Sequence, residues 1–219
     1  MTKEKKKFAV VIAGCGVYDG AEIHEATMAL YAIVQQGATY QIFAPNIDQH
    51  HVINHITGEE MNEKRNVLVE AARIARGKIL PLSDFKASDY DALIFPGGFG
   101  VAKNLCTFAF DGANCKVNPE VERVITETHR AKKPIGALCI SPVLLAKVIK
   151  GSVVTIGHDK TTSEAIESFG AKHKTTTHGE VAVDTENLLF TTPCYMLDAT
   201  IVDIANGAMA IVKEMLKNV

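Results

Sequence analysis

"KKPIGALCISPVLLAKV", residues 132–148, joins a strand pattern to a helix pattern, with a cysteine at the junction. The apolar run "PIGALC" is typical of a buried parallel strand, and Ser141-Pro142 is typical of a helix N-cap followed by proline. A cysteine in an apolar run is most often a packing residue. At a strand–helix junction its side chain would instead be exposed at the sheet edge, where the helix dipole favours a thiolate. Cys139 is therefore either a core residue or a nucleophile.

Strand and helix patterns alternate along all 219 residues. The β-branched run "FAVVIAG" (8–14) indicates a strand covered on both faces, and "EIHEATMALYAIVQQG" (22–37) has helical apolar spacing. Other strand patterns lie at 39–45, 89–100, 134–139 and 152–157, with a pair in 180–193, and other helix patterns lie at 62–77, 118–133, 141–150, 162–171 and 198–217. We predict one α/β domain over residues 8–219, with a mostly parallel sheet and helices on both faces, after a flexible tail at residues 1–7.

Composition and charge narrow the class of protein. A formal net charge of -2 gives no general attraction to nucleic acid or to anionic membranes. No segment reaches the roughly 20 apolar residues of a membrane helix, and no secretory signal pattern is present. Five cysteines form no dense disulfide framework, so we expect reduced thiols and a cytoplasmic location. His50, His51 and His55 lie near Glu59 without a supporting cysteine pair, so we predict no metal site.

Four segments follow predicted strands, at the sheet edge where open α/β folds bind ligands. They are residues 13–22, the "PGGFG" turn at 96–100, Cys139 itself and "TTPCYM" at 191–196. The adjacent glycines Gly97 and Gly98 allow backbone N–H groups to approach a ligand closely, and the N–H of Ile140 follows the cysteine. The glycine pair therefore indicates either half of an oxyanion site or a plain tight turn.

A thiolate nucleophile also needs a group that handles protons. Glu22 and Glu25 lie three residues apart at the start of the first predicted helix, so both face the same neighbourhood. Asp19 and Glu22 also have the spacing of a capping box, and acidic residues are favoured at helix N-termini. The sequence leaves open which of the two glutamates reaches the sulfur.

Several of these motifs resemble one family. "GALCISPVLL" after "ALIFPGGFG", with a glutamate after the first strand, resembles the ThiJ/PfpI branch of the class I glutamine-amidotransferase-like superfamily. "GCGVYDGAEIHEA", "VINHITGEEMNEKRNVLVEAARIARG", "FPGGFGVAKNL" and "TTPCYML" resemble its glyoxalase-like ElbB subfamily. The resemblance implies a flavodoxin-like three-layer sandwich and a homodimer. It assigns to the site Cys139 as nucleophile, Glu22 or Glu25 as carboxyl partner, Gly98 and Ile140 as oxyanion donors, and Gly97 and Asn104 as further substrate-binding positions.

The sequence departs from two enzyme classes of this superfamily, which argues against protease and amidotransferase activity. PfpI-type proteases carry a histidine directly after the nucleophilic cysteine, where this chain has Ile140. Glutamine amidotransferases place His-x-Glu after a late strand, whereas "HGE" (178–180) precedes that strand pattern here. His158 ends the strand pattern at 152–157, so it is either a further site residue or a solvated loop residue.

The resemblance thus predicts a cofactor-free enzyme that converts glyoxal to glycolate. The Cys139 thiolate would add to an aldehyde carbon, and Glu22 or Glu25 would move a proton between the two carbons. The rival prediction is a redox-sensing or binding protein whose Cys139 is reversibly oxidised without turnover. We expect a small dicarbonyl substrate and a second copy of the chain as partners, and no nucleic acid or membrane.

Overall fold

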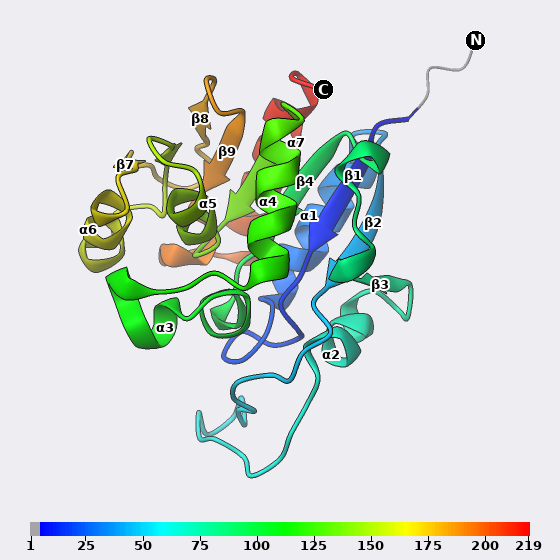
Figure 1. Ribbon diagram of the computed structural model, residues 1–219, viewed down its shortest axis with the longest axis vertical. Helices are drawn as coiled ribbons and strands as arrows, with labels where there is room; N and C mark the ends of the chain where they lie inside the picture. The colour runs from blue at the N-terminus through cyan, green and yellow to red at the C-terminus, as the bar shows by residue number, and fades with distance from the viewer. Residues whose placement is uncertain (1–4) are drawn as a thin grey trace.

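A central sheet of seven strands, in the order β3-β2-β1-β4-β5-β9-β8, organises the protein (Figure 1). The structure is a computed structural model and describes residues 5–219. Every neighbouring pair in the sheet is parallel except β8 and β9. The strands are β1 (Lys7–Val11), β2 (Thr39–Ala44), β3 (Ile79–Pro81), β4 (Ala92–Phe95), β5 (Ile135–Leu138), β8 (Ala182–Asp184) and β9 (Leu189–Thr192). A separate two-stranded parallel sheet is formed by β6 (Val153–Val154) and β7 (Lys172–His173).

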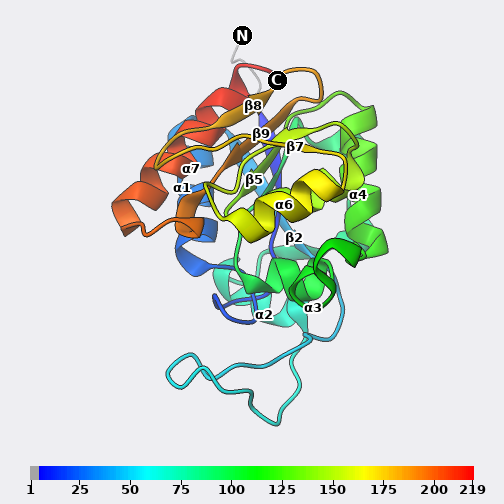
Figure 2. The same cartoon turned by 90° about the vertical axis from the view of Figure 1, so that its left-hand side faces the viewer.

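Helices cover both faces of the sheet and complete three layers (Figures 1 and 2). They are α1 (Ile23–Gln35), α2 (Val67–Ile74), α3 (Phe108–Asp111), α4 (Pro119–Arg130), α5 (Pro142–Val148), α6 (Lys160–Ser168) and α7 (Ile201–Leu216). Buried side chains of α1, α2 and α7 pack on one face, and those of α4, α5 and α6 pack on the other. The predicted α/β fold with a mostly parallel sheet is confirmed.

Strand β1 shows why the sheet needs cover on both sides. Phe8 and Val10 belong to the core beneath α1 and α7, whereas Ala9 and Val11 belong to the core beneath α4 and α5. All four are fully buried. Because successive side chains of a strand point to opposite faces, a continuous apolar run supplies both cores at once.

Two helix starts differ from the sequence prediction. Helix α2 begins at Val67, not at residue 62, because the side chain of Asn66 accepts a hydrogen bond from the Val69 N–H and caps the helix there. Helix α1 is capped by Glu22 itself, while Asp19 accepts a hydrogen bond from the Ile53 N–H. The capping box predicted from Asp19 and Glu22 is therefore not formed.

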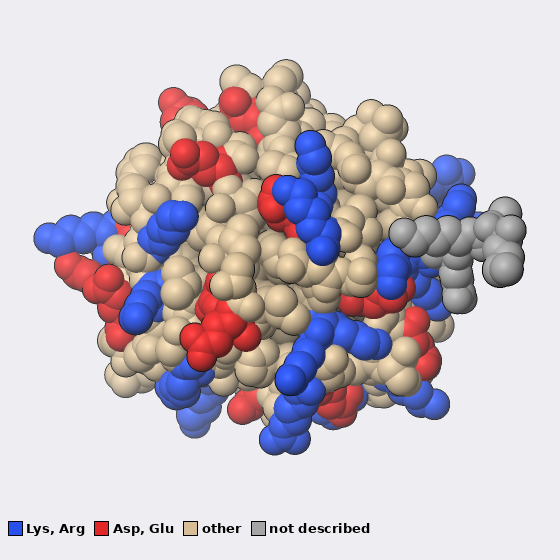
Figure 3. Space-filling view, turned by 90° about the horizontal axis from the view of Figure 1, so that it is seen from above, with Lys and Arg blue, Asp and Glu red and all other residues tan. Residues whose placement is uncertain are grey.

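The N-terminal segment joins the sheet earlier than predicted. Lys7 already belongs to β1, and the Lys6 ammonium lies 3.0 Å from an Asp91 carboxylate oxygen. Residues 1–4 of the predicted tail lie outside the described residues. Within residues 5–219, no helix is both long enough and apolar enough to cross a membrane. On the face seen in Figure 3, basic and acidic side chains are interspersed rather than gathered by sign.

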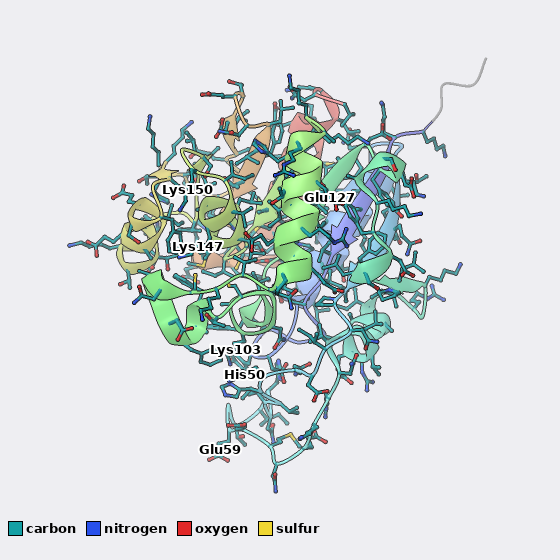
Figure 4. All side chains as sticks on the ribbon, in the orientation of Figure 1. His50, Glu59, Lys103, Glu127, Lys147 and Lys150 are labelled. Carbon is teal, nitrogen blue, oxygen red and sulfur yellow. The ribbon has the colours of Figure 1, made fainter. Side chains whose placement is uncertain are left out.

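Residues 45–66 form a long connection that projects from the body of the molecule (Figure 1). His50 and Glu59 lie on it, away from the central helices (Figure 4). The ring of His50 packs on Phe110, with centroids 4.1 Å apart, and beside the ring of His51. Among the described residues, no group of three or more His, Cys, Asp or Glu side chains is placed to hold a metal ion.

Candidate active site

The segments after β1, β4, β5 and β9 meet at one edge of the sheet, as parallel strands require. The turn after β4 is tied to the segment after β1 by a hydrogen bond from the Glu22 N–H to the Gly97 carbonyl, 2.9 Å. The end of β5 is tied to β9 by a bond from the Cys139 N–H to the Thr192 carbonyl, 3.0 Å. Backbone hydrogen bonds therefore fix the positions of all four segments around Cys139.

Cys139 lies on a strained turn between β5 and α5. Its φ of 60° is in the left-handed region, which a residue with a β-carbon adopts at a cost. The Ser141 N–H donates to the Leu138 carbonyl at 3.0 Å, closing the turn. The Ser141 hydroxyl donates to the Pro96 carbonyl at 2.8 Å and does not cap α5. The predicted side-chain cap is thus replaced by a bond that holds the cysteine turn against the turn after β4.

Glu25 lies beside the sulfur and is completely buried. Its side chain hydrogen-bonds to the Cys139 thiol. One carboxyl oxygen accepts the Gly97 N–H at 2.9 Å, and the other accepts the Tyr195 N–H at 3.2 Å. Glu22 instead uses a carboxyl oxygen to accept the Glu25 N–H at 2.7 Å. The structure thus separates the two glutamates: Glu25 contacts the thiol, and Glu22 caps α1.

The glycine pair after β4 is required by close packing. A β-carbon on Gly97 would lie 2.4 Å from the Cys139 β-carbon and 2.5 Å from a Glu25 carboxyl oxygen. Gly98 has a φ of +103°, and a β-carbon there would lie 2.3 Å from the Glu22 nitrogen. The N–H groups of Gly98 and Ile140 both donate hydrogen bonds to the Cys139 sulfur. A negative charge on the sulfur, or on an atom bound to it, therefore faces two fixed donors.

Burial controls the protonation of this pair. Loss of solvation, followed by the charge of Glu22, raises the pKa of Glu25 to about 8. Loss of solvation, followed by the charge of ionised Glu25, raises the pKa of the Cys139 thiol well above its usual range. The sequence had led us to expect a thiolate favoured by the helix dipole. In the structure the resting pair keeps its protons at neutral pH, and its first proton is lost near pH 8.

Cys139 opens into a cavity of about 490 Å³. The residues that line it are Val17, Glu22, Gly98, Phe99, Ala102, Phe108, Ala109, Gly112, Cys139, Ile140, Asp159, Thr161, Thr162, Tyr195 and Met196. Several come from α3, from the π-helical turn Val101–Leu105 and from the segment that begins α6. The sheet edge supplies the reactive groups, and these later segments supply the walls.

Gly97 and Glu25 lie outside the cavity lining but contact Cys139 or its partner, whereas Asn104 and His158 lie outside the lining and have other surroundings. Asn104 is buried, and its amide nitrogen donates to the carbonyls of Ala13 and Asp19. Its amide oxygen accepts the His50 N–H at 2.9 Å, so Asn104 ties loops together and does not line the cavity. His158 is exposed and is absent from the lining, although its neighbour Asp159 belongs to it.

Cys15 and Arg65 also lie outside the site. Cys15 is a free thiol and forms no disulfide with Cys139, and burial followed by the charge of Glu70 raises its pKa. Arg65 contacts Glu63 and Glu70, and it does not line the cavity. It is therefore not placed to receive an anionic substrate group.

Sequence reasoning missed the contribution of Tyr195. Its backbone N–H positions Glu25, its side chain lines the cavity, and its hydroxyl lies 2.8 Å from Nδ1 of His24. The segment "TTPCYM" was selected only because it follows a strand. No spacing in the sequence shows that its backbone bonds to a glutamate 170 residues earlier.

Known proteins share both the sequence and the fold. The chain is 51% identical to the mitochondrial ES1 protein homolog of Rattus norvegicus, over 98% of this chain and 85% of that protein. It is also 51% identical to the mitochondrial glutamine amidotransferase-like class 1 domain-containing protein 3 of Homo sapiens, over 96% of this chain and 82% of that protein. A solved structure, the isoprenoid biosynthesis protein with amidotransferase-like domain from Ehrlichia chaffeensis, superposes with a TM-score of 0.90. It is 35% identical and covers 97% of this chain and 100% of that one.

The expected cytoplasmic location is contradicted by these relatives, because both mammalian proteins are named as mitochondrial. That expectation was wrong because free cysteines and the lack of a secretory pattern argue only against the secretory route. They do not distinguish between compartments that keep thiols reduced.

The family model described as DJ-1/PfpI matches residues 15–193, which include the turn after β4, the cysteine turn and β9. This family includes glyoxalases and redox-sensing proteins. The chain therefore belongs to the DJ-1/PfpI family, with the class I glutamine amidotransferase-like fold.

Proposed function

We propose that the protein is a glyoxalase-like enzyme that converts glyoxal to glycolate without a cofactor. One observation carries the proposal: the Cys139 thiol is hydrogen-bonded to the buried Glu25 carboxyl group and faces the N–H groups of Gly98 and Ile140. A nucleophile and two oxyanion donors thus face one cavity, and the buried proton carrier contacts the nucleophile from outside the cavity lining.

The first step joins the substrate to the protein. The Cys139 sulfur attacks one aldehyde carbon of glyoxal, and the carbonyl π electrons move to its oxygen. The N–H groups of Gly98 and Ile140 stabilise the oxyanion, which takes up the thiol proton to give a hemithioacetal. Glu25 is in position to carry this proton because it contacts the sulfur directly.

The remaining steps move two protons and add one water. Glu25, after losing its own proton to solvent, removes the hydrogen from the sulfur-bearing carbon as a carboxylate and returns it to the neighbouring carbon. The hydroxyl proton of the hemithioacetal passes to the oxygen of that neighbouring carbon, which gives a thioester of glycolate. Water attacks the thioester carbonyl, the carbon–sulfur bond breaks, and glycolate leaves as the thiol is restored. The sum is glyoxal plus water to glycolic acid, with no net oxidation. A carboxyl group with a pKa of about 8 suits this work, since it exchanges protons near neutral pH.

The rival proposal is a thiol sensor. The same Gly98 and Ile140 donors would stabilise an oxidised Cys139, so the site suits reversible oxidation as well. Turnover separates the two, because a sensor consumes oxidant only until its thiol is modified. The homodimer implied by the family resemblance belongs to the same proposal, and sedimentation velocity tests it.

The direct test is glycolate production from glyoxal by the purified protein. We expect multiple turnovers that Cys139→Ala abolishes, while Cys15→Ala, which changes a thiol outside the cavity, retains them. Glyoxal consumption limited to one equivalent per chain would reject the enzyme and favour the sensor.

A further inference from the structure

We infer that the preferred substrate is a neutral 2-oxoaldehyde bearing an apolar substituent, such as an aryl or branched alkyl group, and not glyoxal itself. This inference rests on the proposed function, and it specifies the substrate class of that site. The cavity is much larger than glyoxal. A cavity of about 490 Å³ is in the range of ~300–1,000 Å³ that holds drug-sized ligands, whereas glyoxal has only two carbons.

The lining combines reactive groups with apolar side chains. Cys139, Glu22 and the Gly98 backbone lie at the sheet edge, where the reacting carbonyl carbons must sit. Phe99 and Phe108 contribute aromatic side chains to the same lining. Val17, Ala102, Ile140 and Met196 add further apolar surface to the lining. An apolar substituent on the second carbonyl carbon would extend from the reactive end onto these walls and be removed from water.

The charges around the cavity exclude an anionic substituent. The lining contains no lysine or arginine, and its two charged residues, Glu22 and Asp159, are both acidic. Asp159 is exposed and caps α6 by accepting the Thr162 N–H at 2.8 Å. Hydrogen bonds from the Thr162 hydroxyl and backbone N–H lower the pKa of Asp159, which keeps it negative at neutral pH.

The lysines next to lining residues do not compensate for this charge. Lys160, between Asp159 and Thr161 in the sequence, is exposed, and its ammonium lies 3.8 Å from a Glu164 carboxylate oxygen. Lys103 belongs to the π-helical turn that supplies Ala102, and its ammonium donates to the Tyr18 carbonyl at 2.8 Å. Lys147 of α5 donates to the Ala113 carbonyl at 3.1 Å and lies over the ring of Phe169 (Figure 4). A substrate with a carboxylate or phosphate group would meet two acidic residues and no cation in the lining.

The walls come from segments that are distant in the sequence. Helix α3 lies close to α6 (Figures 1 and 2), and the turn that follows α3, Gly112–Asn114, contacts α6. Phe108 and Ala109 come from α3, whereas Thr161 and Thr162 come from α6. These walls do not contribute to the cysteine–carboxyl pair, so a change in them is expected to alter the choice of substrate more than the chemical step.

The test compares three aldehydes that share the reacting group: glyoxal, phenylglyoxal and 4-carboxyphenylglyoxal. We expect kcat/KM for phenylglyoxal to exceed that for glyoxal by about tenfold or more, the gain from burying an aromatic ring. We expect the carboxylated analogue to be at least about tenfold poorer than phenylglyoxal, since its charge meets Asp159. Equal efficiency for glyoxal and phenylglyoxal, or for the neutral and anionic aryl compounds, would overturn the inference.

Substitutions in the cavity lining test whether the cavity causes these differences in kcat/KM. Met196→Ala and Phe108→Ala each remove apolar surface from the cavity wall. Each should reduce the ratio of kcat/KM for phenylglyoxal to kcat/KM for glyoxal. Asp159→Asn keeps a helix-capping residue and should raise kcat/KM for the carboxylated analogue several-fold relative to phenylglyoxal. Glu164→Gln, on α6 but outside the lining, is the matched control and should change neither ratio.

A separate readout distinguishes failure of the proposed function from failure of this inference. If no aldehyde is turned over, the proposed function fails, and the cavity is then probed by alkylation of Cys139 with iodoacetamide. Acetophenone should slow this alkylation, and 4-acetylbenzoate should not. Equal protection by the two ketones, or none by either, would overturn the apolar, non-anionic character of the site.

Discussion

The buried carboxyl group of Glu25 and the thiol of Cys139 share a hydrogen bond at the edge of the sheet. Burial is the main cause of the raised pKa of both groups. The charge of ionised Glu25 raises the pKa of the Cys139 thiol further, whereas the hydrogen bond with Cys139 lowers the pKa of Glu25. The backbone N–H groups of Gly97 and Tyr195 fix the carboxyl oxygens, and those of Gly98 and Ile140 face the sulfur. The pair therefore behaves as one unit, whose position and protonation depend on these backbone supports.

Gly97→Ala should displace the pair. A β-carbon at this position would lie 2.4 Å from the Cys139 β-carbon and 2.5 Å from a Glu25 oxygen, so the cysteine turn or the glutamate must move. We expect a loss of about 1–3 kcal/mol in the free energy of unfolding, with turnover reduced at least about tenfold. Urea denaturation and glyoxal kinetics measure the two effects.

Gly207→Ala in α7 is the matched control. A β-carbon there would meet Thr192 and Cys194 only at ordinary contact distances of 3.4 and 3.5 Å. Alanine also favours a helix over glycine by up to about 1 kcal/mol. This variant should be neutral or more stable, and a loss equal to that of Gly97→Ala would contradict the steric account.

Glu25→Gln should stabilise the protein increasingly as the pH rises. The pKa of Glu25 is about 8 in the folded protein, against an ordinary value of 4.5, so the folded state holds a proton that the unfolded state loses in this range. Wild-type stability therefore falls with rising pH between these values, and glutamine does not titrate. We expect the difference between variant and wild type to grow by on the order of 3 kcal/mol from pH 5 to pH 8.

Urea denaturation at the two pH values measures this change. Glu164→Gln, on the solvent-exposed side of α6, is the control. A difference between Glu25→Gln and wild type that stays constant with pH would show that the Glu25 carboxyl is not held protonated by burial.

The rate at which the Cys139 thiol is alkylated should depend on the proton held by the Glu25 carboxyl group. The pair loses its first proton near pH 8, and the remaining proton is then shared between oxygen and sulfur. The rate of alkylation by iodoacetamide should therefore rise with pH through about 8. In Glu25→Gln only the buried thiol titrates, so the midpoint should move to higher pH. Mass spectrometry of the Cys139 peptide follows the rate, and an unchanged midpoint would show that the two groups are not coupled.

Asn104→Ala should affect stability and not chemistry. Its amide makes three hydrogen bonds to backbone groups of the segments after β1 and β2. Their loss leaves buried polar groups unpaired, and we expect the free energy of unfolding to fall by roughly 2–4 kcal/mol. The fraction that remains folded should keep kcat/KM within a few-fold of wild type. A tenfold loss of kcat/KM in folded protein would return Asn104 to the substrate site.

The fold and the cysteine turn follow from local patterns in the sequence. Alternating strand and helix patterns predict the layers, and a cysteine between "PIGAL" and Ser-Pro predicts the turn. The sequence does not separate Glu22 from Glu25, because a spacing of three places both on one helix face. The helix start decides between them: Glu22 turns back to accept the Glu25 N–H, and Glu25 alone reaches the sulfur.

The cavity could not be predicted from local patterns. Phe108 and Thr161 are far apart in the sequence, and only the packing of the turn after α3 against α6 brings them to the same cavity. Asn104 was misassigned for a related reason. Its position in a site motif does not reveal that backbone groups occupy its amide.

The measurement that tests the account most directly is glycolate formation from glyoxal by wild type, Cys139→Ala, Glu25→Gln and Glu22→Gln, with folding checked by circular dichroism. We predict that Cys139→Ala and Glu25→Gln each lose at least about 100-fold in kcat, while Glu22→Gln stays within about tenfold of wild type. Activity retained in Cys139→Ala, or lost in Glu22→Gln but kept in Glu25→Gln, would contradict the assignment of the Cys139–Glu25 pair.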